Sequence, residues 1–177
     1  KDNTFFVDLK NDKVEAKVLI WATGAKHRHL NIPGEEKYNG KGVSYCGTCD
    51  GAFFKNKKII VIGGGDTALT DALFLNKISD DITIIHRRNR FRAQDNLIKQ
   101  IDNSNIKKIM NNKPLEILGD QTKVNSILIE NTETKEKTTI ETDAVFIFAG
   151  MIPQTTLLNK ELLNDHNYVQ TNENMES

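Results

Sequence analysis

The chain has 177 residues, of which 38% are hydrophobic, enough for one ordinary core. Lys plus Arg and Asp plus Glu both number 24, so the formal net charge is zero and no broad field would attract nucleic acid or an anionic membrane. No apolar run reaches the roughly 18 residues of a membrane span, and the first residues form neither a signal core nor an initiator start. We therefore expect a soluble chain that begins partway through a longer protein, with no nucleic-acid or membrane partner.

The first part of the chain predicts a β-hairpin and then a connection between two domains. Two strands are expected, Thr4–Leu9 and Val14–Ala22, and the second ends in an apolar run, Val18–Ala22, that predicts burial. The stretch Lys26–Gly42 is rich in His, Pro, Gly and charged residues and has no apolar period. It therefore indicates a connection between domains, with a boundary near residues 31–34.

A compact βαβ unit follows. Ile59–Ile62 is a short β-branched run of the kind that is buried on both faces of a parallel sheet. After three glycines, apolar residues recur at helical spacing over 66–77, which predicts a helix with one apolar face. Ile82–Ile85 then predicts the second strand. This order of elements favours an α/β fold with a Rossmann-like parallel sheet.

The rest of the chain predicts one more helix and several short strands. The helix is expected over 93–101, and the strands over 107–110, 124–130, 138–141 and 144–149, with a hairpin tip at 131–137 that suggests a small antiparallel sheet. Beyond Pro153 the pattern is lost. We expect the apolar strands Val18–Ala22 and Ala144–Ala149 to be left with faces meant for neighbours outside this chain.

The glycine-rich segment between the first strand and helix of the βαβ unit fits a dinucleotide-binding turn. In this G-x-G-x-x-A pattern, the first glycine permits the tight turn, the third lets a pyrophosphate approach the main chain, and the alanine keeps helix and strand close. The free N–H groups at the start of the helix would face the phosphates. The alternative is a tight turn without a ligand. The candidate residues are Gly63, Gly64, Gly65, Asp66, Thr67 and Ala68.

A basic segment after the second strand indicates which dinucleotide would bind. About 20 residues after the glycines, an NAD site would carry Asp or Glu to hold the ribose hydroxyls. This chain has His86, Arg87 and Arg88 there, with Arg92 close behind. Guanidinium groups form forked hydrogen bonds with a 2′-phosphate and offer no acceptor to a 2′-hydroxyl, so NADPH is favoured over NADH. A solvated basic loop is the alternative.

The two cysteines of the chain, Cys46 and Cys49, form a C-x-x-C motif. Their loop is too short to stabilise a fold but suits a dithiol that cycles, which favours a reducing cytoplasm. A zinc site would need further ligands; His27 and His29 lie upstream, but neither their spacing nor their order resembles a zinc finger, and we expect no metal. Asp50 would exchange a proton with a sulfur if burial raised its pKa, and the alternative is that it serves as an N-cap or turn residue.

Taken together, these motifs resemble the low-molecular-weight thioredoxin reductases. The resemblance rests on Cys46-Gly47-Thr48-Cys49-Asp50-Gly51, on Val61 to Ala68, and on His86-Arg87-Arg88 through Phe91-Arg92-Ala93, in that order. Upstream, Thr23-Gly24 and Ile32-Pro33-Gly34 are similar to that family's exit from its FAD domain. Downstream, Val145 to Gly150 with Pro153 is similar to the segment through which that family's chain returns to its FAD domain. The resemblance covers roughly residues 5–170.

The resemblance implies a domain organisation and an activity. Residues 1–30 would end the first half of an FAD domain, 31–153 would form the NADPH-binding domain with the C-x-x-C motif, and 154–177 would begin the second half. NADPH would reduce FAD, FAD would then reduce the Cys46–Cys49 disulfide, and the resulting dithiol would reduce thioredoxin. The full-length enzyme would be a homodimer. Cys49 would face the flavin, Cys46 would attack thioredoxin, and Asp50 would donate the proton. Thr23, Gly24 and Gly150 would contribute to cofactor binding at the crossings.

The sequence departs from the family pattern at a few residues, and other functions remain as alternatives. Gly47 stands where the family usually has Ala, which we expect to loosen the redox loop, and Thr70-Asp71 stands where two acidic residues are usual. The sequence has no N-terminal G-x-G-x-x-G half to hold the FAD adenosine and no C-terminal Gly-Asp segment to hold its flavin end, so we expect the chain alone to be inactive. The alternatives are another NADPH flavoprotein, of the ferredoxin- or peroxiredoxin-linked kind, and a non-catalytic NADPH-binding or redox-sensing module. The first of these reductases usually lacks the cysteine pair and the second usually lacks the arginine pair.

Overall fold

The computed structural model describes residues 4–176, which form two compact units. The larger unit comprises His27–Met151, and the smaller one combines the described residues before and after it. The sequence interpretation placed the central domain at 31–153. Which cofactor each unit serves stays a prediction. None of the helices in the described part of the chain is long and apolar enough to cross a membrane.

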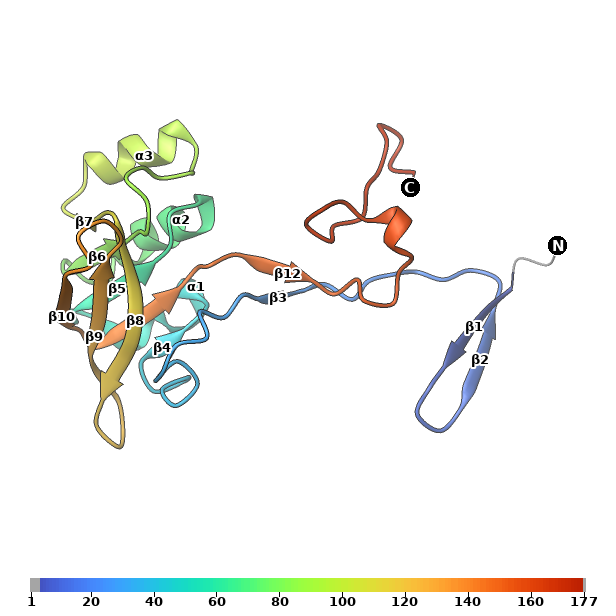
Figure 1. Ribbon diagram of the computed structural model, residues 1–177, viewed down its shortest axis with the longest axis horizontal. Coiled ribbons are helices and arrows are strands. Elements are labelled where there is room, and N and C mark those ends of the chain that lie inside the picture. Colours follow the sequence, from blue (N-terminus) through green and yellow to red (C-terminus); the bar gives the residue numbers. More distant parts are fainter. Residues whose placement is uncertain (1–3, 177) are drawn as a thin grey trace. The chain divides into compact units, whose positions relative to one another are not determined.

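The larger unit is a mixed α/β structure, which confirms the predicted fold class. It contains a parallel sheet of five strands in the order β4-β11-β5-β6-β7 and an antiparallel sheet of three strands in the order β10-β9-β8 (Figure 1). The bounds of its strands are β4 Val43–Ser44, β5 Ile59–Ile62, β6 Ile82–Ile85, β7 Lys107–Ile109, β8 Asn112–Gly119, β9 Val124–Asn131, β10 Lys137–Glu141 and β11 Ala144–Ile147. Its helices are α1 Gly47–Asp50, α2 Asp66–Leu75 and α3 Asp95–Asp102, with a 3₁₀ turn, η1, at Gly51–Phe54.

The central strand β5 explains how the layers are held together. All its residues are buried, and they alternate between two apolar clusters. Ile59 and Val61 pack with residues of α2 and α3, whereas Ile60 and Ile62 pack with residues of β8 and β9. The parallel sheet therefore lies between the helices and the antiparallel sheet, and a run of β-branched residues is what such a two-sided position requires.

Two predicted strands differ from the structure. Val18–Ala22 is not a strand, and Val18 and Ile20 are 75% and 83% exposed, because no strand in residues 4–176 pairs with it. The expectation that Ala144–Ala149 would leave an apolar face without a neighbour is also wrong. Strand β11 pairs in parallel with β4 on one side and β5 on the other, and is fully buried.

The smaller unit has little regular structure. Its hairpin, β1 Phe5–Asp8 and β2 Lys13–Ala16, is shorter than predicted, and a 3₁₀ turn, η2, spans Lys160–Leu162. The chain passes between the units through β3 Ala25–His27 and β12 Met151–Pro153, which pair with each other. The sequence did not indicate this ladder, because each strand has only three residues.

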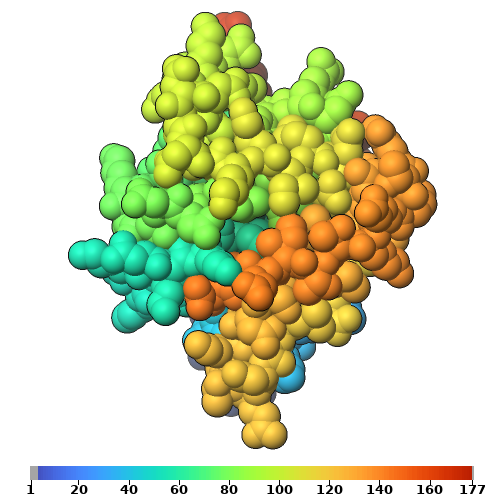
Figure 2. All heavy atoms as spheres, turned by 90° about the vertical axis from the view of Figure 1, so that its left-hand side faces the viewer, coloured from blue at the N-terminus to red at the C-terminus, as the bar shows by residue number. Residues whose placement is uncertain are grey.

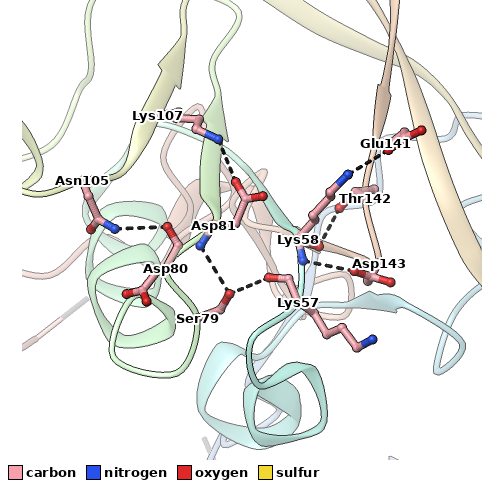
Figure 3. A network of polar contacts seen from close by, with 10 residues as sticks. All are labelled: Lys57, Lys58, Ser79, Asp80, Asp81, Asn105, Lys107, Glu141, Thr142 and Asp143. Atoms are coloured by element: carbon pink, nitrogen blue, oxygen red, sulfur yellow. Dashed lines mark hydrogen bonds and ion pairs between the residues drawn. The ribbon is translucent and has the colours of Figure 1, made fainter.

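The amino ends of the parallel strands are fixed by a polar network (Figure 3). The Lys58 backbone N–H donates to Asp143 Oδ2 at 3.1 Å, and Lys58 Nζ lies 2.7 Å from Glu141 Oε2. Lys107 Nζ lies 2.8 Å from Asp81 Oδ1. On the face shown in Figure 2, the segment before β5 (teal) accordingly lies beside the segment from β10 into β11 (orange). In open α/β sheets ligands bind at the carboxyl ends of the strands, so this edge serves the fold and the opposite edge is the candidate site.

Candidate redox and dinucleotide site

The turn after β5 is shaped by the close approach of other groups. A Cβ placed on Gly63 would lie 2.7 Å from the Ala68 Cβ and 2.7 Å from the Phe148 carbonyl oxygen, so no side chain fits there. Gly65 is the N-cap of α2, and a Cβ on it would meet nothing within 4 Å. The turn is thus packed from the protein side at Gly63 and Ala68 and open at Gly65. These are the properties that a phosphate group approaching the main chain requires.

The middle glycine lies against a buried histidine. A Cβ on Gly64 would come within 2.4 Å of His86 Nδ1. The His86 side chain is buried, its ring centroid is 5.7 Å from that of Phe91, and its Nε2 has no hydrogen-bond partner among the described residues. Burial lowers the pKa of His86, with a further contribution from the neighbouring charges of Arg88 and Arg87. His86 therefore supports the glycine turn as a neutral ring.

The basic segment is joined directly to the glycine turn. The Arg92 backbone N–H donates to the Gly64 carbonyl at 2.7 Å, and the Gln94 backbone N–H donates to Asp66 Oδ1 at 2.7 Å. Two motifs that are separate in the sequence thus lie side by side at the carboxyl ends of β5 and β6. Asp66 and Thr67 are exposed at the start of α2.

The arginines of this segment are available to a ligand. Arg87, Arg88 and Arg92 are exposed, and none of them forms an ion pair within residues 4–176. An open cavity of about 800 Å³ borders the loop and is lined by residues that include Arg92 and Phe91. Arg87 and Arg88 do not line this cavity, so the three predicted arginines are not all brought to one pocket. Their role in holding a 2′-phosphate stays a prediction.

Cys46 and Cys49 form a disulfide, as predicted, at the start of the short helix α1. Cys46 is the N-cap and is partly buried, whereas Cys49 is exposed. The Cys49 backbone N–H donates to Cys46 Sγ at 3.2 Å. A donor directed at a sulfur would stabilise the negative charge that develops there when the disulfide opens.

Asp50 is joined to the disulfide loop by Ser44. The Ser44 hydroxyl donates to Asp50 Oδ2 at 2.6 Å and accepts from the Cys46 backbone N–H at 3.1 Å. Ser44 is buried in β4, so it fixes both partners relative to the parallel sheet. Asp50 is the N-cap residue of η1, but its side chain makes no capping bond and instead accepts from Ser44. A role of Asp50 as proton donor stays a prediction.

A second carboxylate holds the residue between the cysteines. The Gly47 backbone N–H donates to Asp71 Oδ1 at 3.0 Å, and Asp71 lies on α2. Burial raises the pKa of Asp71, and the bond from Gly47 partly offsets that rise. The sequence did not identify this contact, because nothing local marks a residue on α2 as a partner of the disulfide loop.

The residue before the first cysteine belongs to a third polar cluster. Tyr45 Oη donates to Glu35 Oε1 at 2.8 Å and lies 2.9 Å from His29 Nδ1. The ring of His27 stacks on Tyr45 with centroids 5.4 Å apart. Burial raises the pKa of Tyr45, and the hydrogen bond to Glu35 adds to the rise. The two histidines thus contact an aromatic ring, and no group of three or more metal-ligating residues occurs in the part of the chain described.

The remaining predicted residues lie at the crossings. Thr23 Oγ1 donates to the Gln154 carbonyl at 2.5 Å, and the Gly24 carbonyl accepts from the Gln154 N–H at 2.9 Å. Gly150 has φ +105° and its carbonyl accepts from Arg28 N–H at 2.9 Å. These bonds hold the paired connections together. A cofactor role for Thr23, Gly24 and Gly150 stays a prediction.

The fold and the site combine an α/β unit, a glycine turn of the kind found in dinucleotide-binding proteins, and a disulfide. The chain belongs to the pyridine nucleotide-disulphide oxidoreductase family, whose model matches residues 1–177. Within this family it is similar to thioredoxin reductases. It is 41% identical over 176 residues to the thioredoxin reductase of Treponema pallidum (strain Nichols), covering 99% of this chain and 57% of the relative. It is 38% identical to that of Bacillus subtilis (strain 168), covering 97% of this chain and 55% of the relative.

Solved structures show the same likeness. The thioredoxin reductase of Lactococcus lactis has a TM-score of 0.89 at 37% identity, covering 99% of this chain and 59% of that one. That of T. acidophilum has a TM-score of 0.87 at 35% identity, with the same coverage of both chains. The chain thus spans between half and two thirds of the length of these relatives.

Proposed function

We propose that the protein to which this chain belongs is an NADPH-dependent thioredoxin-disulfide reductase, and that residues 31–153 are its NADPH-binding domain with the redox disulfide. One observation carries the proposal: a single compact unit holds the Cys46–Cys49 disulfide, an open glycine turn and the arginine segment bonded to that turn. The similarity to enzymes named thioredoxin reductase supports it.

The residues present fit NADPH. The open main chain at Gly65 and the N–H groups of the first turn of α2 would hold the pyrophosphate, while Arg87, Arg88 and Arg92 would hold the 2′-phosphate. The His86 ring, which packs against Gly64, would keep that glycine in place, and Ala68 would keep α2 close to β5. When bound, NADPH supplies the electron pair that opens the disulfide.

We infer that residues 4–176 supply only part of a flavin site. Residues 4–176 contain one strand, glycine turn and helix of the dinucleotide-binding kind, and this is assigned to NADPH. Thr23, Gly24 and Gly150 are bonded to neighbouring backbone and form no second turn of this kind. FAD, implied for the whole enzyme by the family relationship, would therefore be held largely by residues outside this chain.

The disulfide gives the chemistry of the second half-reaction. Two electrons break the S–S bond, and two protons complete the thiols. The Cys46 thiolate would then attack the disulfide of thioredoxin, and a mixed disulfide would form as one thioredoxin thiolate leaves. The Cys49 thiolate would next attack Cys46 Sγ, which closes the Cys46–Cys49 disulfide and releases the second thioredoxin thiolate. Asp50, placed by Ser44, would pass a proton to the departing sulfur.

The surroundings of the disulfide suit a protein substrate. Phe53, which follows in η1, is 80% exposed, and it would offer an apolar contact to a protein substrate. We further propose a cytoplasmic location, since a cycling dithiol suits a reducing compartment, and a homodimer at full length, as the resemblance implies.

NADPH oxidation by the full-length protein with oxidised thioredoxin tests the proposal. We expect turnover with NADPH and thioredoxin together, and almost none with NADH or when thioredoxin is omitted. Turnover that needs ferredoxin or a peroxiredoxin-linked disulfide would favour the related flavoproteins, and no turnover with any acceptor would favour a non-catalytic module.

A further inference from the structure

A hydrogen bond joins the disulfide loop to the helix α2, which packs beside it. The Gly47 N–H, which lies between the two cysteines, donates to Asp71 Oδ1 at 3.0 Å. Asp71 is on the helix that begins at the glycine turn. Gly47 is buried and Asp71 partly buried, so water competes weakly for this bond.

The absence of a side chain at Gly47 is part of this contact. A Cβ on Gly47 would lie 2.4 Å from Asp71 Oδ1 and 3.2 Å from Asp71 Cβ. The carboxylate would have to rotate away from such a Cβ, and would then lose the N–H group. Gly47 and Asp71 therefore fit each other as a pair.

We propose that Asp71 is a positioning residue for the redox disulfide and that Gly47 is the residue that admits it. Its part in catalysis rests on the function proposed above, whereas its effect on the disulfide does not. In the dithiol form, a loop held at Gly47 keeps the two sulfurs close, which raises their effective concentration for each other. The anchored loop thus favours the disulfide over the dithiol.

The test measures the thiol–disulfide equilibrium of Cys46 and Cys49 in this chain against dithiothreitol. In that reaction the protein S–S bond breaks, the reagent forms a cyclic disulfide, and its two thiol protons pass to the cysteines. Neither NADPH, flavin nor thioredoxin takes part. A failure of the proposed enzyme function, seen in NADPH oxidation, is therefore distinguishable from a failure of this proposal.

Asp71→Ala removes the acceptor, and we expect the equilibrium to move toward the dithiol by roughly three- to tenfold, or about 15 to 30 mV. Asp71→Asn keeps an oxygen acceptor and should restore most of the change. Thr70→Ala, the exposed neighbour on α2, should leave the equilibrium unchanged. The Gly47 amide should exchange its hydrogen roughly 10- to 150-fold faster in Asp71→Ala, the range expected for losing one hydrogen bond to a charged group.

Gly47→Ala gives an independent arm. It should shift the equilibrium as Asp71→Ala does, because its Cβ displaces the carboxylate, and the two changes together should shift it no further. Three results would overturn the proposal. They are an Asp71→Ala protein with the same thiol–disulfide equilibrium as Thr70→Ala, an Asp71→Asn protein with the same equilibrium as Asp71→Ala, and additive shifts in the double variant. If Asp71→Ala fails to fold, the comparison is between Gly47→Ala, which should shift the equilibrium, and Asp71→Asn, which should nearly keep it. Equal equilibria in these two proteins would overturn the proposal.

Discussion

Replacing Arg87 and Arg88 with alanine should convert the chain from an NADPH-binding protein into one with little preference between NADPH and NADH. Both side chains are exposed and form no ion pair within residues 4–176, so their removal breaks no bond inside the described structure. The loss would come from contacts with the 2′-phosphate alone.

The size of the effect follows from the bonds that are lost. A hydrogen bond to a charged group contributes about 1.5 to 3 kcal/mol, and two arginines on one phosphate overlap in their effects. We therefore expect NADPH binding to weaken by about 2 to 4 kcal/mol, or about 30- to 900-fold in Kd, with NADH nearly unchanged.

Calorimetric titration of the chain with both nucleotides measures this directly. Lys107→Ala is the matched control, since it removes a positive charge at the amino edge of the sheet, where Lys107 pairs with Asp81 at 2.8 Å. It should alter neither affinity. Equal binding of NADH and NADPH by the unchanged chain, or an equal loss of both in the double variant, would refute the assignment of the arginines.

Four further outcomes are expected. In the full-length protein, Cys46→Ser or Cys49→Ser should abolish thioredoxin reduction while stopped-flow absorbance still shows flavin reduction by NADPH; full turnover by either variant would contradict the role of the pair. The 177-residue chain alone should bind NADPH, remain colourless and lack reductase activity, whereas a yellow preparation with stoichiometric FAD would show a flavin site that we have not recognised. Gly63→Ala should reduce the free energy of unfolding in urea by about 1 to 3 kcal/mol, because its Cβ would lie 2.7 Å from a backbone oxygen. Gly65→Ala, where a Cβ meets nothing within 4 Å, should leave stability almost unchanged yet weaken NADPH binding, and the reverse ranking would count against the geometry of the turn. Burial lowers the pKa of His86, so the unfolded chain binds this proton at a higher pH than the folded one; stability should be full above the unfolded pKa, near 6.5, and fall as pH drops through the folded pKa. His86→Gln should flatten that slope in urea unfolding measured at several pH values, and an unchanged slope would show that His86 does not cause it.

The sequence predicted those parts of the molecule that are specified by neighbouring residues. The run Ile59–Ile62 and the glycines after it define strand and turn within one short segment, and the structure has β5 and the start of α2 as predicted. The Cys46–Cys49 disulfide also lies within one short segment, but the C-x-x-C spacing left other roles open, and the family resemblance was needed to predict the bond.

The parts that the sequence did not predict depend on contacts between distant residues. Asp71 meets Gly47 across 24 positions, and only the packing of α1 on α2 brings them together. Strand β4 has two residues and exists because β11 pairs with it. Conversely, Val18–Ala22 has the composition of a buried strand but no partner strand within residues 4–176, and composition alone does not supply one.

If the proposed function is correct, electrons from NADPH reach the Cys46–Cys49 disulfide. The most direct measurement is anaerobic incubation of the full-length protein with NADPH, followed by alkylation and mass analysis of the peptide that carries both cysteines. We expect both to be alkylated after NADPH and neither to be alkylated without it or with NADH. Cysteines that stay unlabelled after NADPH, or that are labelled equally by NADH, would contradict the account.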